Sequence, residues 1–407
     1  MLFVGNKIRV TLKQTYQTGK LLIAIMSDTS ENSRFYAYLL FAEHFTSKLI
    51  GLSSWKMDTV SIFRKNLFCT QLTTFSYKLS IIGSGYNILL VVFYVLCDIF
   101  IIKKNLNETN KAPVSIKFAF FSILCISVIP VIYVIRQKIL ISVKNQIKDV
   151  DNELMSCLDY KLVQNNINYW TFIINNVLIY CWIVFMLIFE SLWVEIISML
   201  IPMIFGSILI VQYAMIMNMI EKRFKSINVT LLKLKSSMHR TIFNDISSIK
   251  FAYFELCDMC DNTADFYGIP TLIVIILFSI RNISNYYEII LVFLSEIEMQ
   301  NLFYCSGIFA VQTFFLFTTL TTSVTRLLKQ NEETSRIINQ LLDQFTINQA
   351  ITEKLSKFSS DLWHMKVEFT LCDIVPLDCS LLTIISGTTV TYLIIAVQFY
   401  LNKTDQE

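Results

Sequence analysis

The chain has 407 residues, of which 54% are hydrophobic and 16% are charged, and its net charge is +3. Soluble domains carry about 45–50% apolar and about 25% charged residues, so this composition excludes a β-sandwich, a Rossmann enzyme and a disordered chain. The near-neutral charge indicates no nucleic-acid partner, and the ten scattered cysteines predict no disulfide framework. Such an apolar, charge-poor composition is typical of a helical protein that crosses the lipid bilayer several times.

The N-terminal part of the chain contains no apolar run of membrane length. Residues 1–20 include four Lys or Arg residues but lack the apolar stretch that forms the centre of a signal peptide. We therefore expect residues 1–78 to form a cytosolic N-terminal region, with the first membrane span acting as its own insertion signal.

Seven later windows are apolar and long enough to cross a bilayer, since a crossing helix needs about 20 residues. These windows are 79–102, 114–135, 169–189, 196–220, 269–290, 301–324 and 380–401. Only four charged residues lie inside them, namely Asp98, Lys117, Arg281 and Glu288. Because a charge at the membrane centre costs at least about 2.5–3.5 kcal/mol, this segregation predicts an all-α membrane protein with seven transmembrane helices.

The basic residues outside the spans predict the orientation of the helices. With the N-terminus in the cytosol, the inner segments hold 28 Lys and Arg residues and the outer loops hold 4. The positive-inside rule then places the N-terminus in the cytosol and the C-terminus outside the cell. The expected order is the N-terminal region, spans one to six over 79–324, cytosolic anchor helices over 325–379, and a seventh span with a short extracellular tail over 380–407.

Most of the chain outside the spans is predicted to be cytosolic. The outer loops are too short to form a ligand-binding domain, so a ligand arriving from outside must bind between the spans. Segments 221–268 and 325–379 carry apolar residues at helical spacing, and we expect them to be helical and to form the main contact between subunits. The clearest apolar stripe comprises Ile338, Leu341, Phe345, Ile351, Leu355 and Phe358.

The sequence contains no convincing catalytic, cofactor or metal site. None of the three histidines has metal-ligand spacing to another histidine or to a cysteine pair. Cys257 and Cys260 form a single C-x-x-C pair, whereas a structural zinc site needs a second pair. No nucleophile elbow or phosphate-binding loop is present, so a membrane enzyme is disfavoured.

The last span carries a polar stripe along one side. Successive residues of an α-helix are about 100° apart around the helix axis. On this basis a stripe about 80° wide carries three Ser or Thr hydroxyls, a glycine, an isoleucine and a glutamine amide. We call this set the polar stripe; its members are Ser380, Thr383, Gly387, Thr391, Ile394 and Gln398. Two interpretations remain open, a water-lined surface with one apolar constriction and a face that hydrogen-bonds to neighbouring helices.

The same span contains a Thr-Tyr pair, five hydrophobic residues and a Gln-Phe pair, running from Thr391 to Phe399. This pattern resembles the signature of the insect gustatory receptors at every position. The segments 369–373, 376–378 and 380–382 resemble the family's approach to that signature, and Gly268 after Tyr267 resembles the start of its fifth span. The length of the chain, its number of spans and its topology also resemble those of the family, so the resemblance extends over the whole chain.

The resemblance implies a ligand-gated cation channel in the plasma membrane, assembled as a homotetramer or as a heteromer with related receptors. The seventh helix of each subunit would line a pore for monovalent and divalent cations. The polar stripe and the signature together predict that Thr391, Ile394 and Gln398 face this pore, while Tyr392 and Phe399 pack on neighbouring helices.

The resemblance also implies that a small-molecule tastant binds among spans 2 to 6. The family's sugar receptors often have Glu after the Thr-Tyr pair, and Leu393 at that position favours a bitter or other non-sugar tastant. An ionisable residue inside a span is a candidate functional residue, and aromatic side chains commonly wall such pockets. The candidate ligand-binding residues are therefore Phe121, Tyr180, Trp182, Arg281, Tyr286 and Tyr304. Alternatively, Arg281 extends to the outer headgroups or pairs with Glu288, and the aromatics form an interfacial belt.

Two other kinds of receptor remain as alternatives. An insect odorant receptor shares the architecture, although the Thr-Tyr and Gln-Phe pairs discriminate against it. A G-protein-coupled receptor would place the N-terminus outside, against the loop charges. The chain also lacks an Asp/Glu-Arg-Tyr motif after span 3 and an Asn-Pro-x-x-Tyr motif in span 7.

Overall fold

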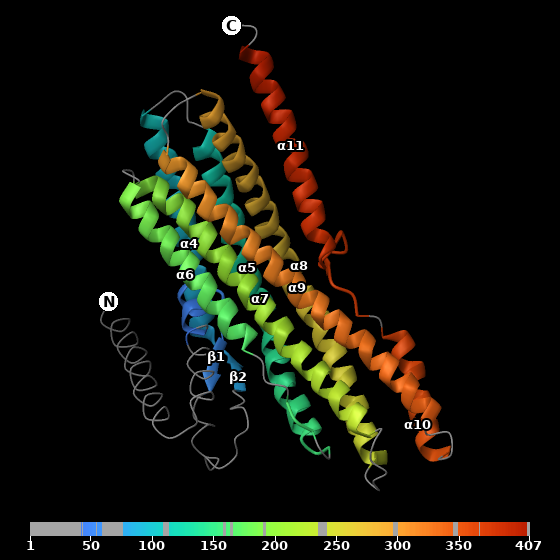
Figure 1. Ribbon diagram of the computed structural model, residues 1–407. Coiled ribbons are helices and arrows are strands. Elements are labelled where there is room, and N and C mark those ends of the chain that lie inside the picture. The colour runs from blue at the N-terminus through green and yellow to red at the C-terminus, as the bar shows by residue number, and fades with distance from the viewer. Residues whose placement is uncertain are drawn as a thin grey trace, which may run out of the picture.

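The structure, a computed structural model, is a bundle of long helices. It describes residues 42, 44–53, 55–58, 76–108, 114–157, 160–162, 166–189, 193–234, 242–295, 300–344, 349–365 and 367–404. Figure 1 shows that the long helices run side by side along one axis and that the last helix stands at the edge of the bundle.

Each predicted span coincides with a helix. The helices are α4 (Ile81–Glu108), α5 (Val114–Leu154), α6 (Ile167–Phe189), α7 (Trp193–Leu234), α8 (Ile242–Ser295), α9 (Gln300–Gln344), α10 (Gln349–His364) and α11 (Ser380–Thr404). Within the described residues, six of them are long and apolar enough to cross a membrane, namely α5 to α9 and α11, and α4 adds the shorter apolar stretch Ile81–Leu96. The predicted all-α membrane fold is confirmed, while the count of seven spans and the orientation of the termini stay predictions.

Several spans continue without interruption into the segments predicted to be cytosolic. Helix α7 runs on to Leu234, α9 runs on to Gln344, and α8 begins at Ile242, well before its predicted span. Glycine and proline are the residues that most often end helices. Neither occurs between 207 and 267 or between 308 and 375, so the sequence gives these helices no reason to stop at the membrane surface.

The expectation of helix throughout 325–379 is wrong at its C-terminal end. Strands β3 (Thr370–Leu371) and β4 (Val375–Pro376) form an antiparallel hairpin there. Pro376 cannot donate a helical hydrogen bond, and both residues of the turn, Cys372 and Asp373, have positive φ angles of 54° and 58°. A second hairpin near the N-terminal region pairs β1 (Trp55–Asp58) with β2 (Ser76–Leu79).

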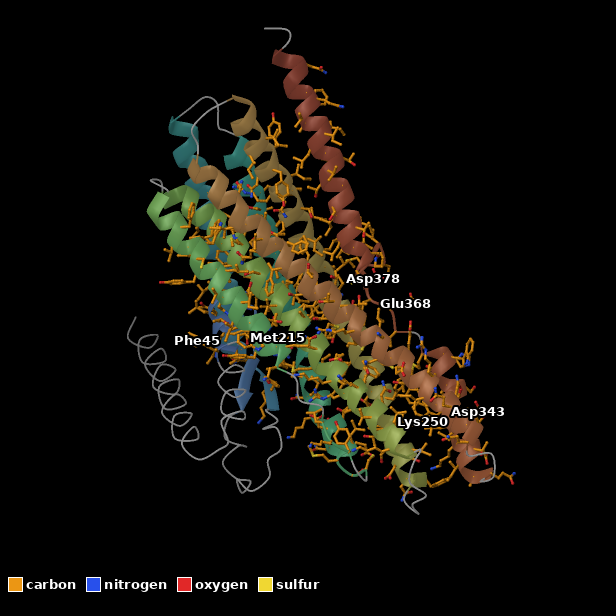
Figure 2. The ribbon with its side chains drawn as sticks, viewed as in Figure 1. Phe45, Met215, Lys250, Asp343, Glu368 and Asp378 are labelled. Carbon is orange, nitrogen blue, oxygen red and sulfur yellow. The ribbon has the colours of Figure 1, made fainter. Side chains whose placement is uncertain are left out.

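Helix α7 is the centre of the bundle. It contacts α5, α6, α8 and α9, and 83% of its most apolar window is buried. A helix that is apolar on all sides is buried in a protein core or in a membrane, and α7 is enclosed mainly by its neighbouring helices. Figure 2 labels Met215 of this helix midway along the bundle.

The predicted apolar stripe in the anchor region is buried. Ile338 and Leu341 on α9 pack in the core, as do Ile351, Leu355 and Phe358 on α10, and Phe345 lies outside the described residues. Helix α10 contacts both α8 and α9. Lys250 of α8 donates a hydrogen bond to Asp361 of α10, and this bond lowers the pKa of the Asp361 carboxyl group.

A buried ion pair ties α5 to α7 below the predicted membrane. The Arg223 guanidinium donates from Nε to Asp151 Oδ1 at 2.9 Å and from Nη2 to Asp151 Oδ2 at 2.6 Å. Its Nη1 donates to the Met219 carbonyl oxygen at 2.7 Å, and both charged side chains are only 3% exposed. This two-point geometry compensates each charge for the loss of water.

Removing one partner of this pair should destabilise the protein strongly. We expect Arg223→Met to lower the free energy of unfolding by about 3–5 kcal/mol, because Asp151 is left buried without its partner. Thermal unfolding of the detergent-purified protein measures the effect. The double variant Asp151→Leu/Arg223→Met should recover most of the loss, and equal destabilisation of the single and double variants would contradict this account.

Candidate functional site

The β3–β4 hairpin and an N-cap fix the base of α11. Ile374 N–H donates to the Leu371 carbonyl at 3.1 Å, which closes a turn whose two central residues are left-handed, as in a type I′ hairpin. Asp378 accepts a hydrogen bond from the Ser380 N–H at 2.9 Å, so it caps the first turn of α11. Figure 2 labels Asp378 at this junction.

The hairpin is also seated on α8. A Cβ placed on Gly268 would lie 3.6 Å from the Cys372 backbone nitrogen, which is ordinary van der Waals distance and shows that the turn lies directly against the helix. Leu371, Leu377 and Leu381 are buried beside this contact. These contacts give the residues that precede the Thr391–Phe399 signature a structural role. They attach α11 to the rest of the chain.

One face of α11 packs on α8 and α9. The side chains on that face are buried or half-buried; they are Leu381, Leu382, Ile385, Thr389, Leu393, Ala396 and Val397. At about 100° per residue they centre on the side of the helix opposite the polar stripe. The residues of the polar stripe are all exposed within the isolated chain. The chain therefore uses the apolar face of α11 for its own packing and leaves the polar stripe uncovered.

The polar stripe contains oxygen ligands but no charge. No Asp, Glu, Lys or Arg occurs between 379 and 402. The Thr391 hydroxyl donates to the Gly387 carbonyl oxygen at 2.9 Å, which uses its proton and leaves its oxygen able to accept or to coordinate. Gln398 adds an amide carbonyl, and Ile394 between Thr391 and Gln398 is the apolar member of the polar stripe.

A second group of polar side chains is buried inside the bundle. Both polar atoms of Asn175 on α6 and of Gln312 on α9 have no hydrogen-bond partner among the described residues. The same holds for Trp182 Nε1 on α6 and for Ser279 Oγ and Asn282 Oδ1 on α8. Each unpaired buried group costs about 1–3 kcal/mol of stability, so this group calls for an explanation.

Comparison with known proteins assigns the family. The 7tm chemosensory receptor family matches residues 43–403, which is most of the chain. The chain belongs to this family. A 78-residue segment is 40% identical to gustatory receptor 28b of Drosophila melanogaster, and it covers 19% of this chain and 16% of that receptor. The chain thus matches only about a sixth of that relative's length.

The fold matches that of a solved insect receptor. The olfactory receptor OR5 of Machilis hrabei, determined in complex with eugenol, superposes with a TM-score of 0.61 over 90% of this chain and 98% of that one. The two sequences are only 9% identical, so this likeness concerns the fold. The protein is a multi-pass chemosensory receptor of the plasma membrane and not an enzyme, and the resemblance seen in the sequence is confirmed at this level.

The structure places the predicted signature residues on the surface of the receptor chain. Thr391, Ile394 and Gln398 are exposed together on the polar stripe. Tyr392 is also exposed, and the Phe399 ring is 74% exposed. Their packing on neighbouring helices stays a prediction.

The predicted ligand-binding residues do not share one environment. The rings of Phe121 and Tyr180 are exposed, whereas Trp182 is buried. Arg281 and Tyr286 are half-buried on α8, and the side chain of Tyr304 lies outside the described residues. Their role in ligand binding stays a prediction. Asn175 and Gln312 were not predicted from the sequence, although an amide in a mostly apolar span is itself a signal.

Two glycines should respond differently to the same substitution. A Cβ on Gly206 of α7 would lie 2.7 Å from Phe278 Cζ and 2.8 Å from Val274 Cγ1, whereas a Cβ on Gly387 would meet no described atom within 4 Å beyond the nearby backbone of its own helix. We expect Gly206→Ala to destabilise the receptor by about 1–3 kcal/mol through overpacking.

Gly387→Ala should leave the amount of receptor at the cell surface unchanged. If the polar stripe lines a pore, the added methyl group narrows it, and the whole-cell current per surface receptor should fall. Surface biotinylation and voltage clamp measure the two quantities. A normal current for Gly387→Ala would remove this glycine from the conduction path.

Proposed function

We propose that the receptor is a gustatory-type, ligand-gated, non-selective cation channel whose pore is lined by α11 of each subunit. The observation that carries this proposal is the position of the polar stripe, on the opposite side of α11 from its packing face. A polar surface facing lipid would be unfavourable, so the polar stripe favours either a water-filled pore or another subunit. In a central pore formed by several copies of α11, the polar stripe would face water and the other subunits instead of lipid.

The side chains of the polar stripe fit conduction of cations. Hydroxyl and amide oxygens can replace part of an ion's hydration shell, and a ring of isoleucines can close a pore by excluding water. In this proposal Ile394 forms the gate and Thr391 and Gln398 contact the permeating monovalent and divalent cations. The absence of charge along this part of the sequence supports weak selectivity among cations.

Cysteine substitution tests the pore assignment. We expect Thr391→Cys, Ile394→Cys and Gln398→Cys channels to be blocked by a charged, membrane-impermeant thiol reagent, because their side chains face water. Thr389→Cys and Leu393→Cys, on the packed face of α11, serve as matched controls and should resist the reagent. Block at Tyr392→Cys and Phe399→Cys, with none at the three stripe positions, would reverse the assignment.

We further propose that the receptor assembles as a tetramer through its anchor region, either from identical copies or with related receptors. The apolar side chains of Trp363, Met365 and Ile374 are exposed at the end of α10 and in the hairpin, and Trp363 is 85% exposed. Large apolar side chains clustered outside the bilayer commonly mark a protein interface. A neighbouring subunit would cover them.

Substitution of the anchor tryptophan tests this assembly. We expect Trp363→Glu to shift the detergent-purified receptor from tetramer to smaller species in native mass measurements, because it places a charge in an apolar contact. Glu353→Gln, on the same helix, is the control. A wild-type receptor that conducts as a monomer or dimer would contradict the proposal.

The activating ligand is proposed to be a small-molecule tastant, and Leu393 favours a bitter or other non-sugar compound. An odorant-type channel is the second candidate function, supported by the superposition on an olfactory receptor. Currents recorded during application of a tastant panel and an odorant panel distinguish the two. An extracellular epitope tag after Glu407 separates both from a G-protein-coupled receptor, whose C-terminus is cytosolic.

A further inference from the structure

Asn175 and Gln312 are buried amides whose hydrogen-bonding capacity is not used by the described part of the chain. Their side chains belong to residues that are 1% and 0% exposed, and all four polar atoms lack a partner among the described residues. An amide offers an N–H₂ donor and a carbonyl acceptor. Because native proteins pair nearly all such buried groups, two amides without a partner among the described residues favour a hydrogen-bonding partner outside that part of the chain.

The two amides lie at a similar depth on neighbouring helices. Helices α6 and α9 contact each other and run in opposite directions, as Figure 1 shows. Asn175 lies roughly four turns before the end of α6 at Phe189, and Gln312 lies roughly three turns after the start of α9 at Gln300. These two helix ends lie at the same end of the bundle, so the two amides lie at similar depths, about 21 and 18 Å from it along their helices, and both fall inside predicted membrane spans.

Further unpaired groups extend this site. Trp182 lies two turns above Asn175 on the same face of α6, and its indole N–H is also unpaired. Ser279 and Asn282 contribute unpaired oxygens from α8, which also contacts α9. Unpaired donors and acceptors and an aromatic side chain thus occur on three helices of the bundle.

We propose that Asn175 and Gln312 bind an uncharged ligand that both donates and accepts hydrogen bonds, such as an alcohol, a phenol or a hydroxylated lactone. This inference rests on the channel function proposed above. Two neutral amides satisfy a hydroxyl or carbonyl group completely, but they supply no counter-charge for a permanent cation or a carboxylate entering hydrocarbon. The Trp182 ring suits the apolar body of such a ligand, and its N–H suits a polar substituent.

Thermal unfolding of the purified receptor, measured without any added ligand, provides the first test. The double variant Asn175→Leu/Gln312→Met keeps the side-chain shapes and removes polar groups that the chain does not pair, so its midpoint should stay the same or rise. Asn228→Leu is the contrasting variant. It removes hydrogen bonds to the Gln330 carbonyl at 2.9 Å and from Thr334 Oγ1 at 2.7 Å, and its midpoint should fall.

A fall in the midpoint of the double variant that equals the fall for Asn228→Leu would overturn the proposal. It would show that the two amides are paired in the resting protein, by internal water or by each other, and that they stabilise the fold. This outcome can be observed whether or not any compound opens the channel.

Currents from the intact receptor in oocytes provide the second test. The probes are eugenol and benzyl alcohol, which are uncharged and carry a hydroxyl group, and denatonium and tetraethylammonium, which are permanent cations. We expect activation from the uncharged pair, with an increase of about tenfold or more in the half-activating concentration for Asn175→Leu or Gln312→Met. Asn176→Leu is the matched control, because the Asn176 amide already donates to the Phe172 carbonyl at 2.7 Å.

The outcomes separate this inference from the proposed function. Activation only by the cations, or dose–response curves that neither amide variant shifts, would overturn the inference and leave the channel intact. If no probe evokes a current and thiol modification of Thr391→Cys leaves the basal current unchanged, the channel proposal fails. The midpoint of the double variant still decides whether the two amides are structural.

Discussion

Hydrocarbon cannot satisfy a hydrogen-bonding group, and this constraint governs the whole receptor. It requires every backbone amide in the bilayer to bond within its own helix, which is why the spans are unbroken helices. The same constraint applies to side chains. Several hydroxyls in the spans, such as those of Thr313 and Thr321, donate to a carbonyl of their own helix. Polar groups that find no such partner must meet another helix, water, an ion or a ligand.

Packing around α7 makes the bundle a rigid support, while α11 is attached differently. Helix α7 is enclosed by four other helices, and the Arg223–Asp151 pair and the Asn228 amide tie it to α5 and α9. Helix α11 is held at its base by the hairpin and the Asp378 cap, and along one face by α8 and α9. A helix fixed at one end and along one side can tilt at its free end with little loss of packing.

The sequence alone was sufficient to predict the spans, because apolar length and the near absence of charge are local properties. It also predicted the polar stripe, since side-chain spacing on a helix fixes which residues share a face. It did not predict the hairpin at 370–376, where a short turn interrupts a helical pattern. It also could not indicate that Phe121 and Tyr180 point outward while Asn175 and Gln312 point inward. A span that is apolar on all sides does not reveal which face meets its neighbours, and that choice depends on tertiary packing.

The two sets of polar groups are linked by shared helices. The buried amides lie on α6 and α9, the further unpaired oxygens lie on α8, and α11 packs on α8 and α9. A ligand that draws α6, α8 and α9 together around its polar groups would move the surface on which α11 rests. Because the base of α11 is held at Gly268 of α8, such a movement would tilt the helix and displace Ile394 from the pore axis. Ligand binding would then open the pore if the ligand makes more favourable contacts in the open state than in the closed state. Coupling between two sites requires such a difference.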